Sequence, residues 1–152
     1  MKYALLEKIR AELRSRFELL SRAAFEAHAA ATDPGSKAEG KYDTRSLEAS
    51  YLAAGQARQI DELAETVRIF DNLTLPDFAP SDPIDAGALV ATEMRGETVH
   101  FLLVPTSGGL EIKHEDIEVT LLTPDSALYR KLLGMQVGEE LEMPALTVTG
   151  VS

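Results

Sequence analysis

The sequence predicts an α+β protein in which an N-terminal antiparallel helical hairpin precedes a small antiparallel β domain with one short helix. Two proline-poor stretches before residue 73 repeat apolar residues every three or four positions, the spacing of amphipathic helices. Residues 74–85 then hold three prolines and three aspartates, a composition typical of a linker. Beyond residue 86 the pattern changes to short apolar runs separated by glycine, which indicates strands and turns.

The hairpin prediction rests on two apolar stripes, one from Leu6 to Ala31 and one from Leu47 to Leu73. Each stripe needs a partner, and the Pro34-Gly35 loop between them is short, so we expect an intramolecular coiled coil over residues 1–73 with its tip at 32–42. Helices of about 28 residues would each be roughly 40 Å long. Half of a four-helix bundle, completed by a second copy, remains the alternative to a monomer.

The C-terminal part, residues 86–152, is predicted to form a compact domain. Residues 87–94 and 97–104 read as a hairpin around Arg95-Gly96, and 117–122 as a further strand. Ser126 is a fair N-cap and Gly134 a fair C-cap for a short helix between them. Residues 137–143 and 145–151 are expected to close the sheet as a final pair.

Composition excludes several classes of function. The chain has no cysteine, so disulfides, zinc–thiolate sites and thiol chemistry are absent. A net charge of −10 over 152 residues disfavours autonomous binding to duplex nucleic acid. The first residues are too charged for a signal peptide, and no apolar run approaches the roughly 20 residues of a membrane span. We therefore expect a cytoplasmic protein without a membrane segment.

A string between residues 123 and 141 resembles the signature of Gre-type transcript cleavage factors, and the chain resembles a divergent member of that family. The matching positions combine a short helix, a Leu-Leu-Gly turn and a Val-Gly-Glu-Glu strand start, and they are Ser126, Leu128, Arg130, Leu132, Leu133, Gly134, Val137, Gly138, Glu139 and Glu140. Ala127 and Tyr129 replace the family's proline and glycine. The resemblance implies a coiled-coil hairpin, a linker and an FKBP-like domain, the same order that the periodicity predicts.

The resemblance also implies a role for the hairpin tip. In Gre factors two tip acids enter the secondary channel of RNA polymerase and help to hold a second Mg²⁺ ion, which activates water for cleavage of a backtracked transcript. Alignment on Tyr42 puts Glu39 at the second acid and Ser36 at the first, while Asp33 stands three residues earlier. The candidate catalytic and metal-sharing residues are accordingly Glu39 and Asp33.

The resemblance to Gre factors implies a transcription elongation factor that is not itself an enzyme but acts through the active site of RNA polymerase. It would have no cofactor of its own, only Mg²⁺ shared with the polymerase, and would meet RNA and DNA indirectly. The candidate partner-binding residues are Tyr42, Asp43, Ser126, Leu128, Arg130, Leu133 and Gly134. The alternatives are a polymerase-binding regulator without cleavage activity and a dimeric helical interaction protein. A prolyl isomerase is disfavoured because Phe101 and Tyr129 are the only aromatic residues of the C-terminal domain.

Overall fold

The computed structural model describes residues 1–32 and 45–152 and divides into two compact units. One unit comprises Met1–Lys8 with Leu73–Ser152, and the other comprises Ile9–Asn72. The order of elements is two helices, four strands, a short helix and two strands, so the α+β class predicted from the sequence is confirmed. None of the helices in the described ranges is long and apolar enough to cross a membrane.

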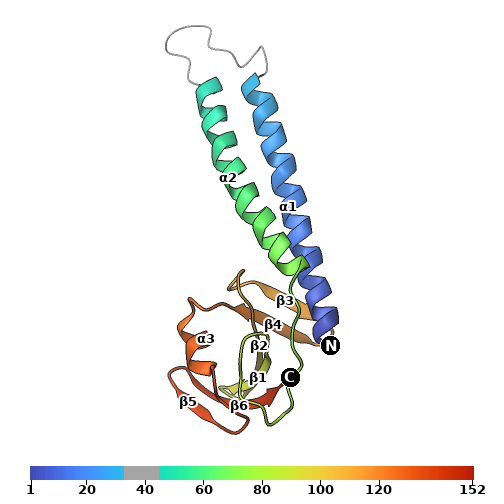
Figure 1. Ribbon diagram of the computed structural model, residues 1–152. Coiled ribbons are helices and arrows are strands. Elements are labelled where there is room, and N and C mark those ends of the chain that lie inside the picture. Colours follow the sequence, from blue (N-terminus) through green and yellow to red (C-terminus); the bar gives the residue numbers. More distant parts are fainter. Residues whose placement is uncertain (33–44) are drawn as a thin grey trace. The chain divides into compact units, whose positions relative to one another are not determined.

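The helical unit contains most of α1 (Lys2–Thr32) and all of α2 (Arg45–Asp71), which run antiparallel to each other in Figure 1. The predicted stripe is the buried side of α1: Ile9 and Leu13 are buried, Phe17 and Leu20 are half-buried, and Leu19 is exposed. Among the hairpin side chains that the structure describes, burial is therefore greatest at the base, where Phe70 of α2 is also fully buried.

Polar contacts also join the two helices at the base of the hairpin. The Arg10 Nε–H donates to the backbone oxygen of Phe70 over 2.7 Å, and Arg14 forms a salt bridge of 2.6 Å with Asp71. Both arginines lie on α1, and both acceptors lie in the last turn of α2. The bond to Phe70 satisfies a carbonyl group that the end of a helix leaves free.

The second unit is built on one six-stranded sheet of order β3-β4-β2-β1-β6-β5. Its strands are β1 (Leu89–Met94), β2 (Glu97–Leu103), β3 (Glu111–His114), β4 (Ile117–Leu122), β5 (Glu140–Glu142) and β6 (Ala145–Val151). The β1–β2 turn has positive φ at both Arg95 and Gly96, as the tight turn predicted there requires.

Two features of the sheet differ from the sequence expectation. The four pairs β1–β2, β1–β6, β3–β4 and β5–β6 are antiparallel as expected, but β2 and β4 pair in parallel, His100 opposite Val119. The sheet is therefore mixed. Strand β3 was not expected, because two charged residues and a histidine in Glu111-Ile-Lys-His114 leave Ile112 as its only strongly apolar position.

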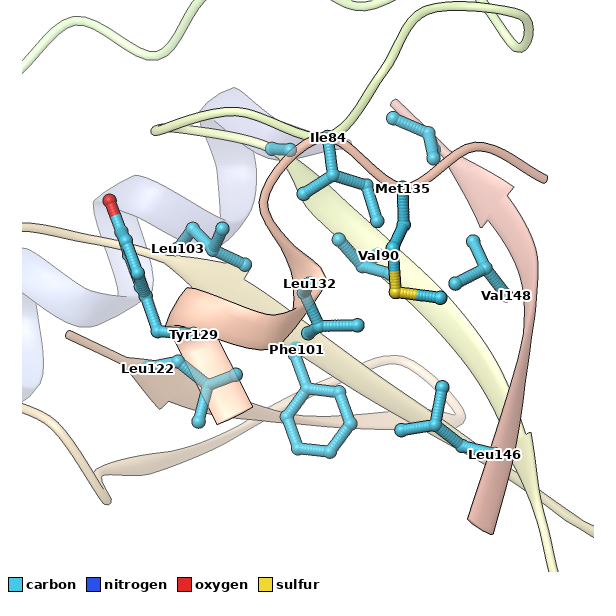
Figure 2. Close-up of a cluster of buried hydrophobic side chains, with 12 residues drawn as sticks. Ile84, Val90, Phe101, Leu103, Leu122, Tyr129, Leu132, Met135, Leu146 and Val148 are labelled. Atoms are coloured by element: carbon cyan, nitrogen blue, oxygen red, sulfur yellow. The ribbon is translucent and has the colours of Figure 1, made fainter. Parts of the chain in front are cut away.

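The short helix α3 (Ala127–Leu132) packs on one face of this sheet. Tyr129 and Leu132 of α3 join a buried cluster with Phe101 of β2 and Val148 of β6, which Figure 2 shows in close-up. Ile84 belongs to the same cluster, although it lies in the segment that the sequence assigns to a linker. The last residues of that segment thus contribute to the core of the unit.

Candidate functional site

The signature residues form one continuous segment from the N-cap of α3 to the start of β5. Gly134 and Gly138 have φ values of +82° and +94°, which residues with a side chain rarely adopt. The Gly134 N–H donates to the Ile84 oxygen, the Ile84 N–H donates to the Met135 oxygen, and the Gly138 N–H donates to the Val148 oxygen, each over 2.8 Å. The two glycines of the signature thus allow the chain to leave α3 and turn back along the sheet.

The residues of the signature, including the candidate partner-binding residues, differ in how much of each side chain is exposed. Leu132 is fully buried, whereas the adjacent Leu133 has 41% of its surface exposed. Arg130 is exposed, and its Nη1 donates to the Pro124 oxygen over 3.3 Å. Ser126 and Leu128 are half-buried, and Leu128 packs against the core. An exposed leucine and an exposed arginine on one short segment offer apolar surface and a charged donor to a partner.

Two hollows are lined in part by signature residues. One, of about 510 Å³, is lined by Leu133 and Gly134 together with residues of the preceding segment, among them Phe78 and Asp82. The other, of about 450 Å³, is lined by Asp125 and Ser126 together with the turn at Gly108-Gly109. The structure therefore brings Ser126, Leu128, Arg130, Leu133 and Gly134 together between two concave surfaces, and this region is the candidate partner-binding site.

The candidate tip residues Asp33, Glu39, Tyr42 and Asp43 lie outside the described residues, as does Ser36. Their roles stay predictions from the sequence. In the part of the chain that the structure describes, no group of three or more His, Cys, Asp or Glu residues could hold a metal ion.

The sequence interpretation missed one concave site in the same unit. A cavity of about 250 Å³ is lined by Leu75, Pro76, Gly87, Leu103, Pro124 and Tyr129, among others. Burial, and secondarily the charge of Asp85, raise the pKa of the Tyr129 hydroxyl above its ordinary value. These residues come from four separate stretches of the sequence, so no local motif could have indicated the cavity.

Comparison with known proteins gave matches among solved structures alone. No protein-family model and no curated protein matches the chain. Among solved structures, GreA factor homolog 1 of Thermus thermophilus is similar at 18% identity, over 94% of each chain, with a TM-score of 0.37. The homologue from Thermus aquaticus is similar at 19% identity, over 93% of this chain and 92% of that one, with a TM-score of 0.35.

Proposed function

We propose that the chain is a Gre-like transcription factor that binds bacterial RNA polymerase and modulates transcript cleavage in backtracked complexes. The observation that carries this proposal is the conformation of the signature: its short helix, its two positive-φ glycines and its strand start all occur where the motif requires them. They occur in a mixed-sheet domain that follows two long helices.

In this proposal the C-terminal domain binds the polymerase, and the hairpin tip modulates transcript cleavage. The exposed residues Arg130 and Leu133 would contact the polymerase directly, while Ser126, Leu128 and Gly134 would shape the surface around them. The tip would enter the secondary channel, where Glu39 and Asp33 would share a Mg²⁺ ion with the polymerase. Carboxylate oxygens are ligands that Mg²⁺ prefers. The protein would thus be a cytoplasmic accessory factor and not an enzyme in its own right.

The binding step is tested by pull-down of purified bacterial RNA polymerase with the full chain. Leu133→Asp places a charge on the exposed apolar part of the signature and is expected to abolish retention of the polymerase. Met143→Asp is the matched control, because Met143 is 77% exposed in the β5–β6 turn of the same unit but lies outside the signature. Absence of wild-type binding at micromolar concentration overturns the proposal, and so does equal retention by the two variants.

A further inference from the structure

The larger of the two hollows at the signature, of about 510 Å³, lies between the segment before β1 and the turn after α3. Three hydrogen bonds hold these two segments together. The Ile84 N–H donates to the Met135 oxygen and the Gly134 N–H donates to the Ile84 oxygen, each over 2.8 Å, and the side-chain amide of Gln136 donates to the Ser81 oxygen over 3.0 Å. The hollow is therefore preformed, and its volume is typical of a ligand site.

Apolar side chains form most of the lining of this hollow, called here the Leu133 hollow. Ile84 is buried, Phe78 is half-buried and packs against the core, and Leu133 keeps 41% of its surface exposed. Such a lining favours a ligand with an apolar or planar body over a small hydrated ion. Within residues 1–32 and 45–152, the Asp, Glu and His side chains form no group that could hold a metal ion, so the acids of this hollow are not a metal site.

Three aspartates, Asp77, Asp82 and Asp85, give the Leu133 hollow its charge, and no basic residue lines it. Asp82 uses one carboxylate oxygen to accept the Ala79 N–H over 2.7 Å, and Asp85 uses one to accept the Ala86 N–H over 2.8 Å. The second oxygen of each remains available to a ligand. The unit around the hollow contains 14 Asp and Glu against 6 Lys and Arg, a formal net charge of −8, so charge complementarity selects a cationic ligand.

The chain's own Lys2 shows that a lining residue of this hollow already binds a cation. Its Nζ lies 4.9 Å from the centre of the Phe78 ring and donates to the backbone oxygens of Pro76 and Ser152. Burial lowers the pKa of Lys2, and the charge of Asp77 acts in the opposite direction. One of the three aspartates is thus compensated by Lys2, whereas the other two form no salt bridge with any residue that the structure describes.

We propose that the Leu133 hollow receives one arginine side chain of a partner protein. A guanidinium is planar and weakly hydrated, stacks on apolar and aromatic side chains, and has enough donors to bond two carboxylates. It would donate to Asp82 and Asp85 while its aliphatic stem packs against Leu133 and Ile84. This inference rests on the proposed function for the identity of the partner, because Leu133 belongs to the proposed polymerase contact, and it adds the chemistry that the partner presents there.

The first arm of the test titrates the full-length protein with acetyl-arginine amide and follows proton–nitrogen correlation NMR spectra. Saturable shifts are expected at the amides of Ile84 and Gly134, and acetyl-citrulline amide, a neutral isostere, should bind more weakly. The double variant Asp82→Asn/Asp85→Asn should weaken binding of the arginine probe by about fivefold, the size expected for two partly exposed ion pairs. Asparagine keeps an oxygen that can accept the backbone N–H at both positions, so the fold should be retained.

The matched control is Glu115→Gln/Asp116→Asn, which removes the same charge from two exposed residues of the β3–β4 turn and should leave the affinity for the probe unchanged. Three results would overturn the arginine site. They are no saturation in wild type, equal affinities for the arginine and citrulline probes, and equal affinities of the two double variants for the arginine probe.

The second arm measures the affinity of the same proteins for purified bacterial RNA polymerase. Asp82→Asn/Asp85→Asn should bind the polymerase about fivefold more weakly than the control variant, and the difference should shrink as the salt concentration rises. Equal affinities of the two variants would overturn the assignment of the arginine to the polymerase. Absence of wild-type binding overturns the proposed function instead, and selective binding of the arginine probe in the first arm then still supports the arginine site.

Discussion

The Nε–H of Arg10 donates a hydrogen bond of 2.7 Å to the backbone oxygen of Phe70, so the first helix is bonded to the last turn of the second. The Nη2 of the same arginine donates to the backbone oxygen of Asp71 over 3.3 Å. A helix end leaves such carbonyl groups without intrahelical partners, so one guanidinium satisfies two of them here. The position is half-buried, which favours a measurable contribution to stability.

We expect Arg10→Ala to destabilise the helical unit by roughly 1–2 kcal/mol, because two hydrogen bonds to a charged donor are lost. Urea unfolding followed by far-ultraviolet circular dichroism measures this change. Arg16→Ala is the matched control: Arg16 is exposed and pairs with Glu12 one turn earlier on α1, so its loss should cost less than about 0.5 kcal/mol. Equal costs for the two variants would contradict the role assigned to Arg10.

Leu132 and Leu133 are adjacent in sequence but opposite in burial, which makes them a matched pair. Leu132 is 0% exposed in the cluster under α3, and Leu133 is 41% exposed. Leu132→Ala is expected to cost about 2–5 kcal/mol through lost burial and a residual cavity. Leu133→Ala should cost less than about 1 kcal/mol. Thermal unfolding of both variants decides the point, and a larger loss for Leu133→Ala would contradict the orientation of α3.

Substitution of Gly87 tests how closely the segment after the hairpin packs at the start of the sheet. Its φ of +87° and the 2.6 Å separation that a Cβ there would have from Pro76 Cδ both oppose a side chain, so Gly87→Ala is expected to cost about 1–3 kcal/mol. Gly96→Ala is the first control, since it has a φ of +79° but open space, and it should cost less.

Gly55→Ala is the second control for this prediction. Gly55 lies inside α2, and a Cβ added there would meet nothing within 4 Å. Alanine is the better helix former at such a position, so the substitution should stabilise the helical unit by about 0.5–1 kcal/mol. Denaturant unfolding ranks the three variants, and a Gly87→Ala protein as stable as wild type would contradict the close packing against Pro76.

Individual elements also indicate how much of the fold can be predicted from the sequence. The α1 stripe at Ile9 and Leu13 was predictable because helical periodicity is local, and the β1–β2 turn was predictable because Arg95-Gly96 separates two apolar runs. The parallel pairing of β2 with β4 was not, since it joins strands separated by β3 and depends on packing of the whole sheet. The same limit applies to the Tyr129 cavity, whose walls come from distant stretches of the chain.

The raised pKa of Tyr129 predicts a loss of stability in alkaline solution. A hydroxyl whose pKa is higher in the folded than in the unfolded state binds its proton more tightly when folded. Its contribution is therefore fully present below the ordinary tyrosine pKa of 10.0 and is lost as the pH rises through the folded value. Stability measured at rising pH should fall more steeply in wild type than in Tyr129→Phe. Parallel curves would contradict the burial of the hydroxyl.

The tip acids provide a functional prediction. Glu39 is an acid, whereas Ser36 stands in place of the other acid, so assays of the tip distinguish a factor that stimulates cleavage from a regulator without cleavage activity. If the chain stimulates cleavage, wild type accelerates RNA cleavage in backtracked complexes, and Glu39→Ala reduces the rate by about tenfold or more, equivalent to about 1.4 kcal/mol of lost transition-state stabilisation. Asp33→Ala reports whether Asp33 also takes part, and Glu26→Ala, an exposed acid on α1, is the control. Equal rates for all variants would remove both tip acids from the mechanism. Polymerase binding by wild type without acceleration would leave a regulator that occupies the polymerase and does not promote cleavage.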